Sequence, residues 1–176
     1  MTSPIEMHAG PAAGFDEPFE MLDACHQRVE RTLQLLERLS AHLARHGADP
    51  QAQQAARDVM RYFDLAAPQH HEDEERHVLP LLRANGHAAR ADRVLQEHQA
   101  MAKAWAGVRA HLAEIEQGQW VTDSGARATA WAEFASLYRE HMALEERDVF
   151  APVRAHIGAE GLRAMGDEMA RRRGVR

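Results

Sequence analysis

Glycine and proline divide most of this sequence into long segments that each have the residue preferences of an α-helix. Asp49 followed by Pro50 is typical of a helix start, and Gly47, Gly118 and Gly158 each follow a helix-like segment. The segments cover about residues 18–46, 50–85, 88–117, 126–156 and 159–173. The first four are similar in length and joined by short loops, the longest being 119–125. The sequence therefore predicts an all-α fold, an up-down-up-down four-helix bundle with a short C-terminal fifth helix. Pro68 is expected to kink the second helix.

Length and charge set limits on the class of protein. A chain of 176 residues with 45% hydrophobic content suits one domain, which we expect at residues 18–176 after a flexible N-terminal arm of residues 1–17. A net charge of −6 argues against a nucleic-acid partner, which requires a concentrated basic face. No apolar run approaches the length of a membrane-spanning helix, so no membrane partner is expected. The single cysteine, Cys25, cannot form an internal disulfide, and a cytoplasmic location is expected.

Histidine and glutamate interrupt the apolar stripe of every one of the four long helices. A stripe of apolar residues at steps of three and four marks the face of a helix that packs into the core. The first and third stripes each contain one histidine, and the second and fourth each contain a histidine followed four residues later by a glutamate. These residues are His26, His70, Glu74, His98, His141 and Glu145. Because an isolated buried carboxylate costs several kcal/mol, these groups are expected to satisfy one another around metal ions.

An internal repeat supports this choice of residues. The segment HHEDEERHVL from His70 aligns with HMALEERDVF from His141 at an offset of 71, and the surroundings of His26 align with those of His98 at an offset of 72. His71 could pair with Glu75 as easily as His70 with Glu74, but the position that matches His71 is Met142. The repeat therefore favours His70 and Glu74.

The chemistry of these six residues fits a pair of cations. Residues four apart lie on the same face of a helix, so each His-x-x-x-Glu pair can reach one metal region. Each metal would take two histidine nitrogens, and both glutamates could bridge. A bridging oxo, hydroxo or water makes about five ligands per metal, leaving a sixth octahedral position free for a small molecule. The donors favour iron or manganese over a closed tetrahedral zinc site.

The pattern resembles the hemerythrin-like family, the HHE cation-binding domains, over roughly residues 18 to 173. The segments HHEDEERHVLPLL and HMALEERDVFAPV look like the two carboxylate helices of that family, and EMARRRG resembles its C-terminal ending. The resemblance implies a cofactor of two iron ions held by His26, His70, Glu74, His98, His141 and Glu145. It also implies a small diatomic or peroxidic ligand such as O2, NO or peroxide.

The sequence departs from the oxygen-carrying members of the family at two places. Those members have a second histidine one turn after the first on the third helix, where this chain has Ala102. They also have a His-x-x-x-x-Asp arrangement on the fourth helix, where this chain has Glu146. The set of four histidines and two glutamates looks more like bacterial iron-centre repair proteins and eukaryotic iron-sensing domains of the same superfamily. The resemblance thus favours ligand binding, sensing or iron handling over oxygen transport, and a binding protein over an enzyme.

Several alternatives remain open at this level. A ferritin-like di-iron oxidase uses Glu-x-x-His pairs, and Glu74 with His77 fits that pattern once. A metal-free helical interaction module is a further alternative, and a homodimer is neither indicated nor excluded. His77 continues the second stripe towards Leu81, as a partner of a metal ligand or as a core residue. Three further glutamates are expected to form a solvated acidic face: Glu72, Glu75 and Glu146.

Overall fold

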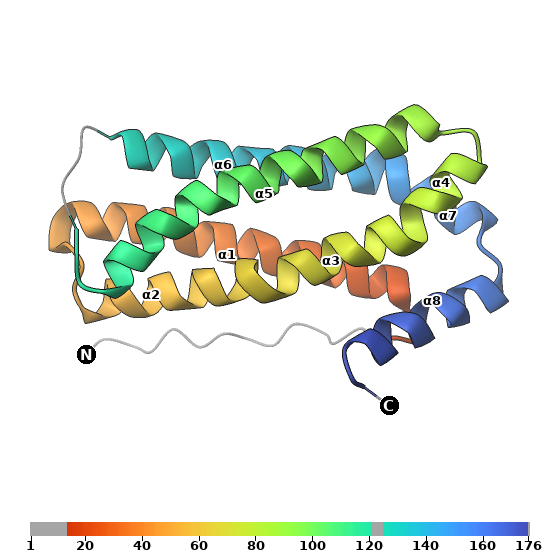
Figure 1. Ribbon diagram of the computed structural model, residues 1–176, viewed down its shortest axis with the longest axis horizontal. Coiled ribbons are helices and arrows are strands. Elements are labelled where there is room, and N and C mark those ends of the chain that lie inside the picture. Colours follow the sequence, from red (N-terminus) through yellow and green to blue (C-terminus); the bar gives the residue numbers. More distant parts are fainter. Residues whose placement is uncertain (1–13, 121–124, 176) are drawn as a thin grey trace.

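The computed structural model describes residues 14–120 and 125–175, and every regular element within these ranges is helical. Figure 1 shows long helical rods packed side by side, each running opposite to the rod before it. The first rod is α1 (Pro18–His46), and the third is α5 (Ala88–Glu116). The second rod contains α2 (Pro50–Arg61), α3 (Ala67–Asp73) and α4 (Leu79–Ala84), and the fourth contains α6 (Ala126–Leu144) and α7 (Phe150–His156). A shorter helix, α8 (Ala159–Arg172), follows. The predicted all-α bundle with a fifth helix is confirmed.

The four rods form a closed ring around one interior. Helix α1 contacts α2, α2 contacts α5, α5 contacts α6, and α6 contacts α1. The start of the second rod is capped as the sequence predicts, because the Asp49 carboxylate accepts a hydrogen bond of 2.8 Å from the backbone N–H of Ala52. Such a ring gives each rod one inward stripe, so side chains at the same height on all four rods meet.

Three π-helical segments widen the second and fourth rods. They are η1 (Tyr62–Ala66), η2 (Glu74–Val78) and η3 (Glu145–Val149). Each precedes a proline, namely Pro68, Pro80 or Pro152. A proline lacks the N–H of a helical hydrogen bond, and its ring clashes with the carbonyl four residues earlier, which here lies within the π segment in every case. The disturbance expected at Pro68 therefore takes the form of a wider turn in an otherwise continuous rod.

The π segment after Glu74 shifts the buried face of the second rod. The expected stripe continued through His77 and Leu81, but both of these side chains are only half-buried. Val78, Leu79 and Leu82 are buried in their place. This expectation was only partly right, since Leu81 packs against the apolar core but stays partly exposed. It assumed a regular α-helix, whereas a π turn contains one more residue than an α turn and rotates everything beyond it.

The apolar core consists of two clusters, one towards each end of the bundle. One is built around Leu36, Phe63 and Phe134, and the other around Leu22 and Val94 with residues of α4, α7 and α8. The polar residues of the stripes lie at the level between the two clusters. Apolar packing on both sides excludes water from this level and fixes the height of the side chains there.

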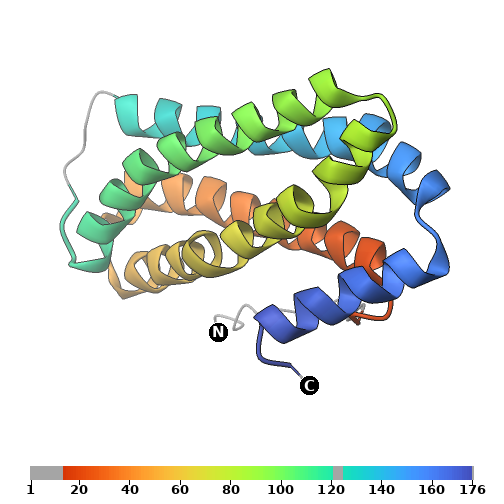
Figure 2. The same cartoon turned by 45° about the vertical axis from the view of Figure 1, so that its right-hand side comes forward.

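Helix α8 is attached to the bundle through buried charge. Figure 2 shows α8 beside the start of α1. The carboxylate of Asp73, on α3, is fully buried and accepts hydrogen bonds from Arg172 and from Arg173, the latter at 2.6 and 3.0 Å. His77 lies 2.7 Å from Glu168 of α8. Gly166 packs against the Phe15 carbonyl so closely that a Cβ atom would clash with it. The C-terminal helix is thus an integral part of the fold.

Two predictions fall partly or wholly on residues that the structure does not describe. The predicted arm of residues 1–17 lies mostly within 1–13, and the predicted loop 119–125 includes 121–124, both outside the described residues. The division of the chain at residue 18 therefore stays a prediction. Within the described ranges, none of the helices combines the length and the apolar character needed to span a bilayer.

Candidate metal centre

The six residues singled out by the stripes lie together in the middle of the bundle. One histidine comes from each of α1, α3, α5 and α6, and the two glutamates are the first residues of η2 and η3. All six side chains are buried, and both glutamates have no exposed surface. The set comprises His26, His70, Glu74, His98, His141 and Glu145. A π turn often marks a functional site in a helix, and here one begins at each of the two glutamates.

Glu145 occupies the centre of the cluster. Its Oε2 atom lies 3.1 Å from His26 Nε2, and its Oε1 atom lies 3.0 Å from His141 Nε2 and 4.0 Å from His98 Nε2. Glu74 is placed in the same way between the two helical hairpins. The first hairpin consists of the first and second rods, and the second hairpin consists of the third and fourth rods. Its Oε1 atom lies 3.2 Å from His70 Nε2, and its Oε2 atom lies 3.2 Å from His98 Nε2. Each carboxylate therefore faces histidines of both hairpins.

These contacts define two sets of donor atoms that share both glutamates. Within each set, the potential ligand atoms all lie within 4.8 Å of one another. The first set is His26, His70, Glu74 and Glu145, and the second is Glu74, His98, His141 and Glu145. Two imidazole nitrogens and two carboxylate oxygens at each position suit a pair of borderline or hard cations with the carboxylates between them.

Many of these donor atoms have no hydrogen-bond partner among the residues that the structure describes. Both oxygens of Glu74, Oε1 of Glu145, and the Nε2 atoms of His98 and His141 are buried without one. Buried polar groups are nearly always hydrogen-bonded, and an orphaned one costs about 1–3 kcal/mol. Five such atoms facing one small volume fit metal ions, which would satisfy all of them at once.

An outer layer of carboxylates orients three of the histidines. The Nδ1 atoms of His26, His98 and His141 lie 3.0, 2.8 and 2.8 Å from carboxylate oxygens. The partners are Glu146, Glu75 and Glu97, in that order. A bond at Nδ1 fixes the ring and leaves Nε2 directed into the centre, as in other metal sites.

The outer carboxylates correct one interpretation of the sequence. Glu75 and Glu146 were expected to belong to a solvated acidic face, but each is partly exposed and also bonded to a buried histidine of the other hairpin. The sequence did contain a signal for this role, because Glu75 and Glu146 occupy matching positions of the internal repeat. Glu72 does behave as expected, since it pairs with Arg76 at the surface. Glu97 was not singled out by the sequence.

One histidine lacks an outer partner, and the repeat explains why. His70 Nδ1 is buried and has no hydrogen-bond partner in residues 14–120 and 125–175. His70 corresponds to His141, whose partner is Glu97, and the residue that corresponds to Glu97 at an offset of 72 is Cys25. Cys25 is a buried free thiol and offers no carboxylate. The two halves of the site are therefore similar but not equivalent.

The protonation of the metal-free site reflects the crowding of like charges. Burial and the neighbouring charge of Glu145 raise the pKa of Glu74 well above its ordinary value. Burial would also raise the pKa of Glu145, but His141 and His26 outweigh it and hold that pKa well below the usual range. At a pH between these two pKa values, one carboxyl of the pair is protonated and the other is ionised.

The four histidines likewise fall into two groups, one with raised and one with lowered pKa values. Burial opposes the charged form of His26 and of His141, yet Glu145 with Glu146 or Glu97 raises the pKa of both imidazoles. Burial and the charge of His26 lower the pKa of His70 to about 3, and burial with the charge of His141 lowers the pKa of His98. His70 and His98 are therefore favoured as neutral ligands, whereas below their raised pKa values His26 and His141 must lose a proton to bind a metal.

Comparison with known proteins agrees with the arrangement of the site. The family model described as the hemerythrin HHE cation binding domain matches residues 17–153, which include all six residues of the cluster. A protein of Haemophilus influenzae (strain ATCC 51907 / DSM 11121 / KW20 / Rd), described as an uncharacterized protein, is 32% identical over 168 residues. The match covers 93% of this chain and 94% of that relative. The likeness to this relative thus covers most of both chains.

Proposed function

Because this chain belongs to the hemerythrin HHE cation-binding domain family, we propose that it is a non-haem di-iron protein that binds or senses a small ligand. The proposed ligand class is O2, NO or peroxide. The observation that carries the proposal is the pair of donor sets that share Glu74 and Glu145 and whose inward atoms lack hydrogen-bond partners. The six residues proposed as ligands are His26, His70, Glu74, His98, His141 and Glu145.

The types of donor atom support iron over a closed tetrahedral zinc site. Two nitrogens and two carboxylate oxygens at each position, with one bridging oxygen, make five ligands and suit an octahedral metal with an open position. Bound iron would supply reversible attachment of a small molecule at that position. The protein's own residues hold the rings in place, neutralise the charge and keep bulk water out, because apolar clusters lie on both sides of the site.

A surface hollow supports access by a small ligand. It has a volume of about 370 Å³ and is lined by residues that include Glu146, Phe150 and Arg154. Glu146 is hydrogen-bonded to His26, and the Phe150 ring stacks on the His26 ring with 5.5 Å between centroids. The hollow therefore ends one side chain away from a proposed ligand, which suits a molecule of two or three atoms better than an organic substrate.

The structure favours this proposal over the two alternatives. In a ferritin-like oxidase, Glu74 and His77 would both face the metals, but His77 pairs with Glu168 of α8 instead. A metal-free interaction module has no need for buried carboxylates whose oxygens lack partners. Iron handling remains the runner-up role for the same centre, and the free, buried Cys25 supports the proposal of a reducing, cytoplasmic location.

Metal analysis with optical spectroscopy tests the proposal directly. We expect about two iron ions per chain in freshly purified or anaerobically reconstituted protein, and visible charge-transfer bands that change on addition of NO, azide or peroxide. A protein that takes up no iron, or whose iron spectrum ignores all small ligands, would contradict the proposed function. Rapid multiple-turnover iron oxidation would support iron handling instead.

Metal binding is expected to release protons and to strengthen with rising pH. His26 and His141 have a raised pKa, as does Glu74, so all three groups hold protons that must leave when they become ligands. Each proton released makes the affinity rise about tenfold per pH unit below the pKa of the group concerned. The affinity should therefore climb steeply through pH 6.5, the ordinary histidine value, and level off above the raised values.

Anaerobic titration with Fe²⁺ or Co²⁺ at several pH values measures this dependence, and a pH-indicator dye in weak buffer counts the protons. An affinity that does not change with pH would show that the histidines are already free of protons or do not bind the metals.

Replacing Glu97 with glutamine is expected to weaken metal binding by about 10–100-fold without unfolding the protein. Glu97 contacts His141 Nδ1 at 2.8 Å, and its charge supports the basicity of that ring. The matched control is Glu140→Gln, since Glu140 is exposed and its carboxylate accepts a hydrogen bond from Ser136 on the same helix. Competition with a chelator compares the variants, and equal affinities would contradict an orienting role for Glu97.

A further inference from the structure

The stretch of the second rod that carries His70 and Glu74 has a second face, which contacts α8. Residues three or four apart share a face of a helix, and His70 with Glu74 forms the face that supplies donor atoms to the centre. Each residue of the neighbouring face contacts Glu168, Arg172 or Arg173, in the last turns of α8 or directly after it. The residues of this face are Gln69, Glu72, Asp73, Arg76 and His77.

Asp73 is the central residue of this contact. Its carboxylate is fully buried and is hydrogen-bonded to Arg172 and to Arg173, the latter at 2.6 and 3.0 Å. Arg173 Nη2 also lies 3.5 Å from the backbone carbonyl oxygen of Gln69. Asp73 is followed directly in the chain by Glu74, so a shift of the Asp73 backbone moves this glutamate as well. The two arginines therefore help to fix the position of Glu74.

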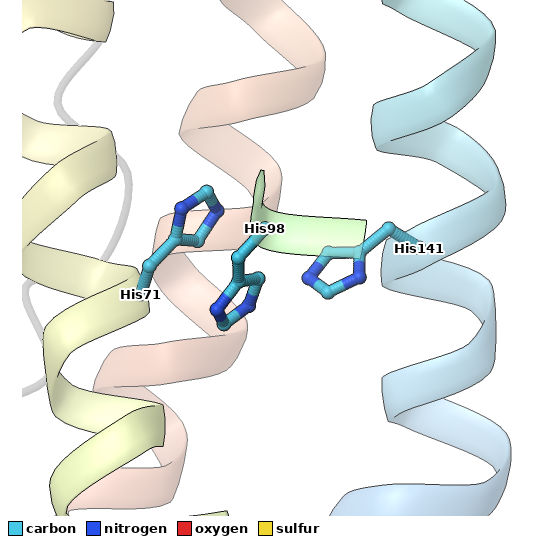
Figure 3. Close-up of side chains that lie close together, drawn as sticks. All are labelled: His71, His98 and His141. Carbon is cyan, nitrogen blue, oxygen red and sulfur yellow. The ribbon is translucent and has the colours of Figure 1, made fainter. Parts of the chain in front are cut away.

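The inner side of the same stretch packs against the other hairpin. Figure 3 shows His71, on α3, together with His98 and His141. The His71 ring stacks on the His98 ring with 4.1 Å between centroids and an angle of 11° between planes. Because the lone pair of an imidazole nitrogen lies in the ring plane, two nearly parallel rings cannot both direct one at the same ion. His71 thus serves as packing between α3 and α5, and the stretch is held between this packing and α8.

The internal repeat shows that the charged contact with α8 belongs to the first hairpin. The residues that correspond to Glu72 and Asp73 are Ala143 and Leu144, whose apolar side chains cannot pair with arginine. Leu144 is buried in the apolar cluster that also contains Met165 of α8. An apolar residue therefore suffices at this place in the matched helix. A buried ion pair adds little stability over apolar packing, so stability alone does not account for the charges around Asp73.

We propose that Arg172 and Arg173, acting through Asp73, are positioning residues of the metal centre, so that docking of α8 and metal binding favour each other. This inference rests on the proposed function, since it requires that the centre holds metal. With α8 docked, Glu74 is held where its two oxygens each lie 3.2 Å from a histidine nitrogen. With metal bound, Glu74 is held from the inside, and the outer face keeps the shape that α8 fits. Such coupling is reciprocal, so each event strengthens the other by the same factor.

Replacement of Arg173 by methionine tests the positioning role. Methionine keeps the apolar part of the side chain, and Arg172 still compensates Asp73, so the fold should be kept. The matched control is Arg171→Met, which removes the same charge from an exposed place on the same turn. In anaerobic titrations of metal-free protein with Co²⁺, we expect Arg173→Met to bind at least about tenfold more weakly than Arg171→Met. Loss of a positive charge by itself favours cation binding, so weaker binding by a folded variant reports lost positioning.

The visible absorption of bound Co²⁺ gives a second readout of the same variants. A displaced Glu74 changes the geometry of coordination, so the bands should change in Arg173→Met and stay as in the wild type in Arg171→Met. The melting temperature of the metal-free proteins shows whether each variant is folded.

Amide hydrogen exchange of the wild type tests the coupling in the reverse direction. Bound Co²⁺ should slow exchange in peptides from α8 by at least about tenfold relative to the metal-free protein, because the same factor must appear on both sides of the coupling. The slowing should be clearly smaller in Arg173→Met than in Arg171→Met. The measurement on the wild type decides the question even if Arg173→Met is unstable.

The outcomes separate this inference from the proposed function. Co²⁺ binding by Arg173→Met that equals or exceeds that of Arg171→Met would overturn the positioning role and leave the di-iron proposal intact. Exchange in α8 that ignores Co²⁺ in the wild type would do the same. A wild type that binds no metal would overturn the proposed function itself.

Discussion

Replacing Glu145 with glutamine is expected to abolish the metal pair while the bundle stays folded. Glu145 belongs to both donor sets and lies within 3.1 Å of His26 on one side and 3.0 Å of His141 on the other. Glutamine has the same shape, but it carries no charge, and its amide group presents hydrogens to one of the two metals. Loss of a shared ligand should exceed the roughly 10–100-fold effect of losing an outer partner, so iron content should fall from two per chain to less than one.

Metal analysis after reconstitution and chelator competition measure this loss. The matched control is Glu133→Gln, because Glu133 is an exposed glutamate on the same helix α6. In the metal-free state the variant should also lower the pKa of His26 and His141, since Glu145 contributes to raising both. Full occupancy of two metals with unchanged affinity in Glu145→Gln would exclude Glu145 as a bridging ligand.

Removing the two arginines that contact Asp73 should have the largest effect on stability. Asp73 is fully buried, and its charge is compensated by Arg172 and Arg173 from the end of α8. In the double variant Arg172→Met with Arg173→Met, the long apolar side chains keep much of the packing but leave the carboxylate unpaired. An uncompensated buried charge of this kind costs about 3–5 kcal/mol, so α8 should detach and the melting temperature should fall by many degrees.

The two single variants and a control variant at a neighbouring arginine complete this experiment. Either arginine alone still gives Asp73 a partner, so each single replacement should cost clearly less than the double. Arg171→Met is the matched control, because Arg171 is exposed on the same turn. Chemical denaturation of the metal-free proteins, followed by circular dichroism, gives the free energies of unfolding. If the double variant is as stable as Arg171→Met, the ion pairs do not fasten α8.

The sequence predicts the architecture well because the information is local and repeated. Gly47 and Gly118 follow the ends of helices α1 and α5, and Asp49 caps the next helix as expected. The six inward polar residues were recognisable because each interrupts an apolar stripe and has a counterpart in the other hairpin. The structure brings all six together in the middle of the bundle.

Other features depend on contacts that spacing along the chain cannot reveal. Glu97 and Glu75 look like ordinary surface glutamates until the rods are placed side by side, when each meets a histidine of another helix. Asp73 likewise finds its arginines about 100 residues away. The repeat favoured His70 over His71, and the structure places His70 in the cluster with Glu74, while the His71 ring stacks on His98.

The wider turns after Glu74 and Glu145 have a consequence for how related sequences should be aligned. Each turn adds one residue to the helix directly beyond a glutamate of the centre. The side chains after the turn are therefore rotated around the helix axis relative to those before it. A core pattern extended across Glu74 in a single phase assigned His77 and Leu81 to the interior, whereas Val78 and Leu82 are the buried residues there. Alignments and designed variants of this fold should treat the two halves of each carboxylate helix as separate units, and should keep the number of residues between glutamate and proline fixed.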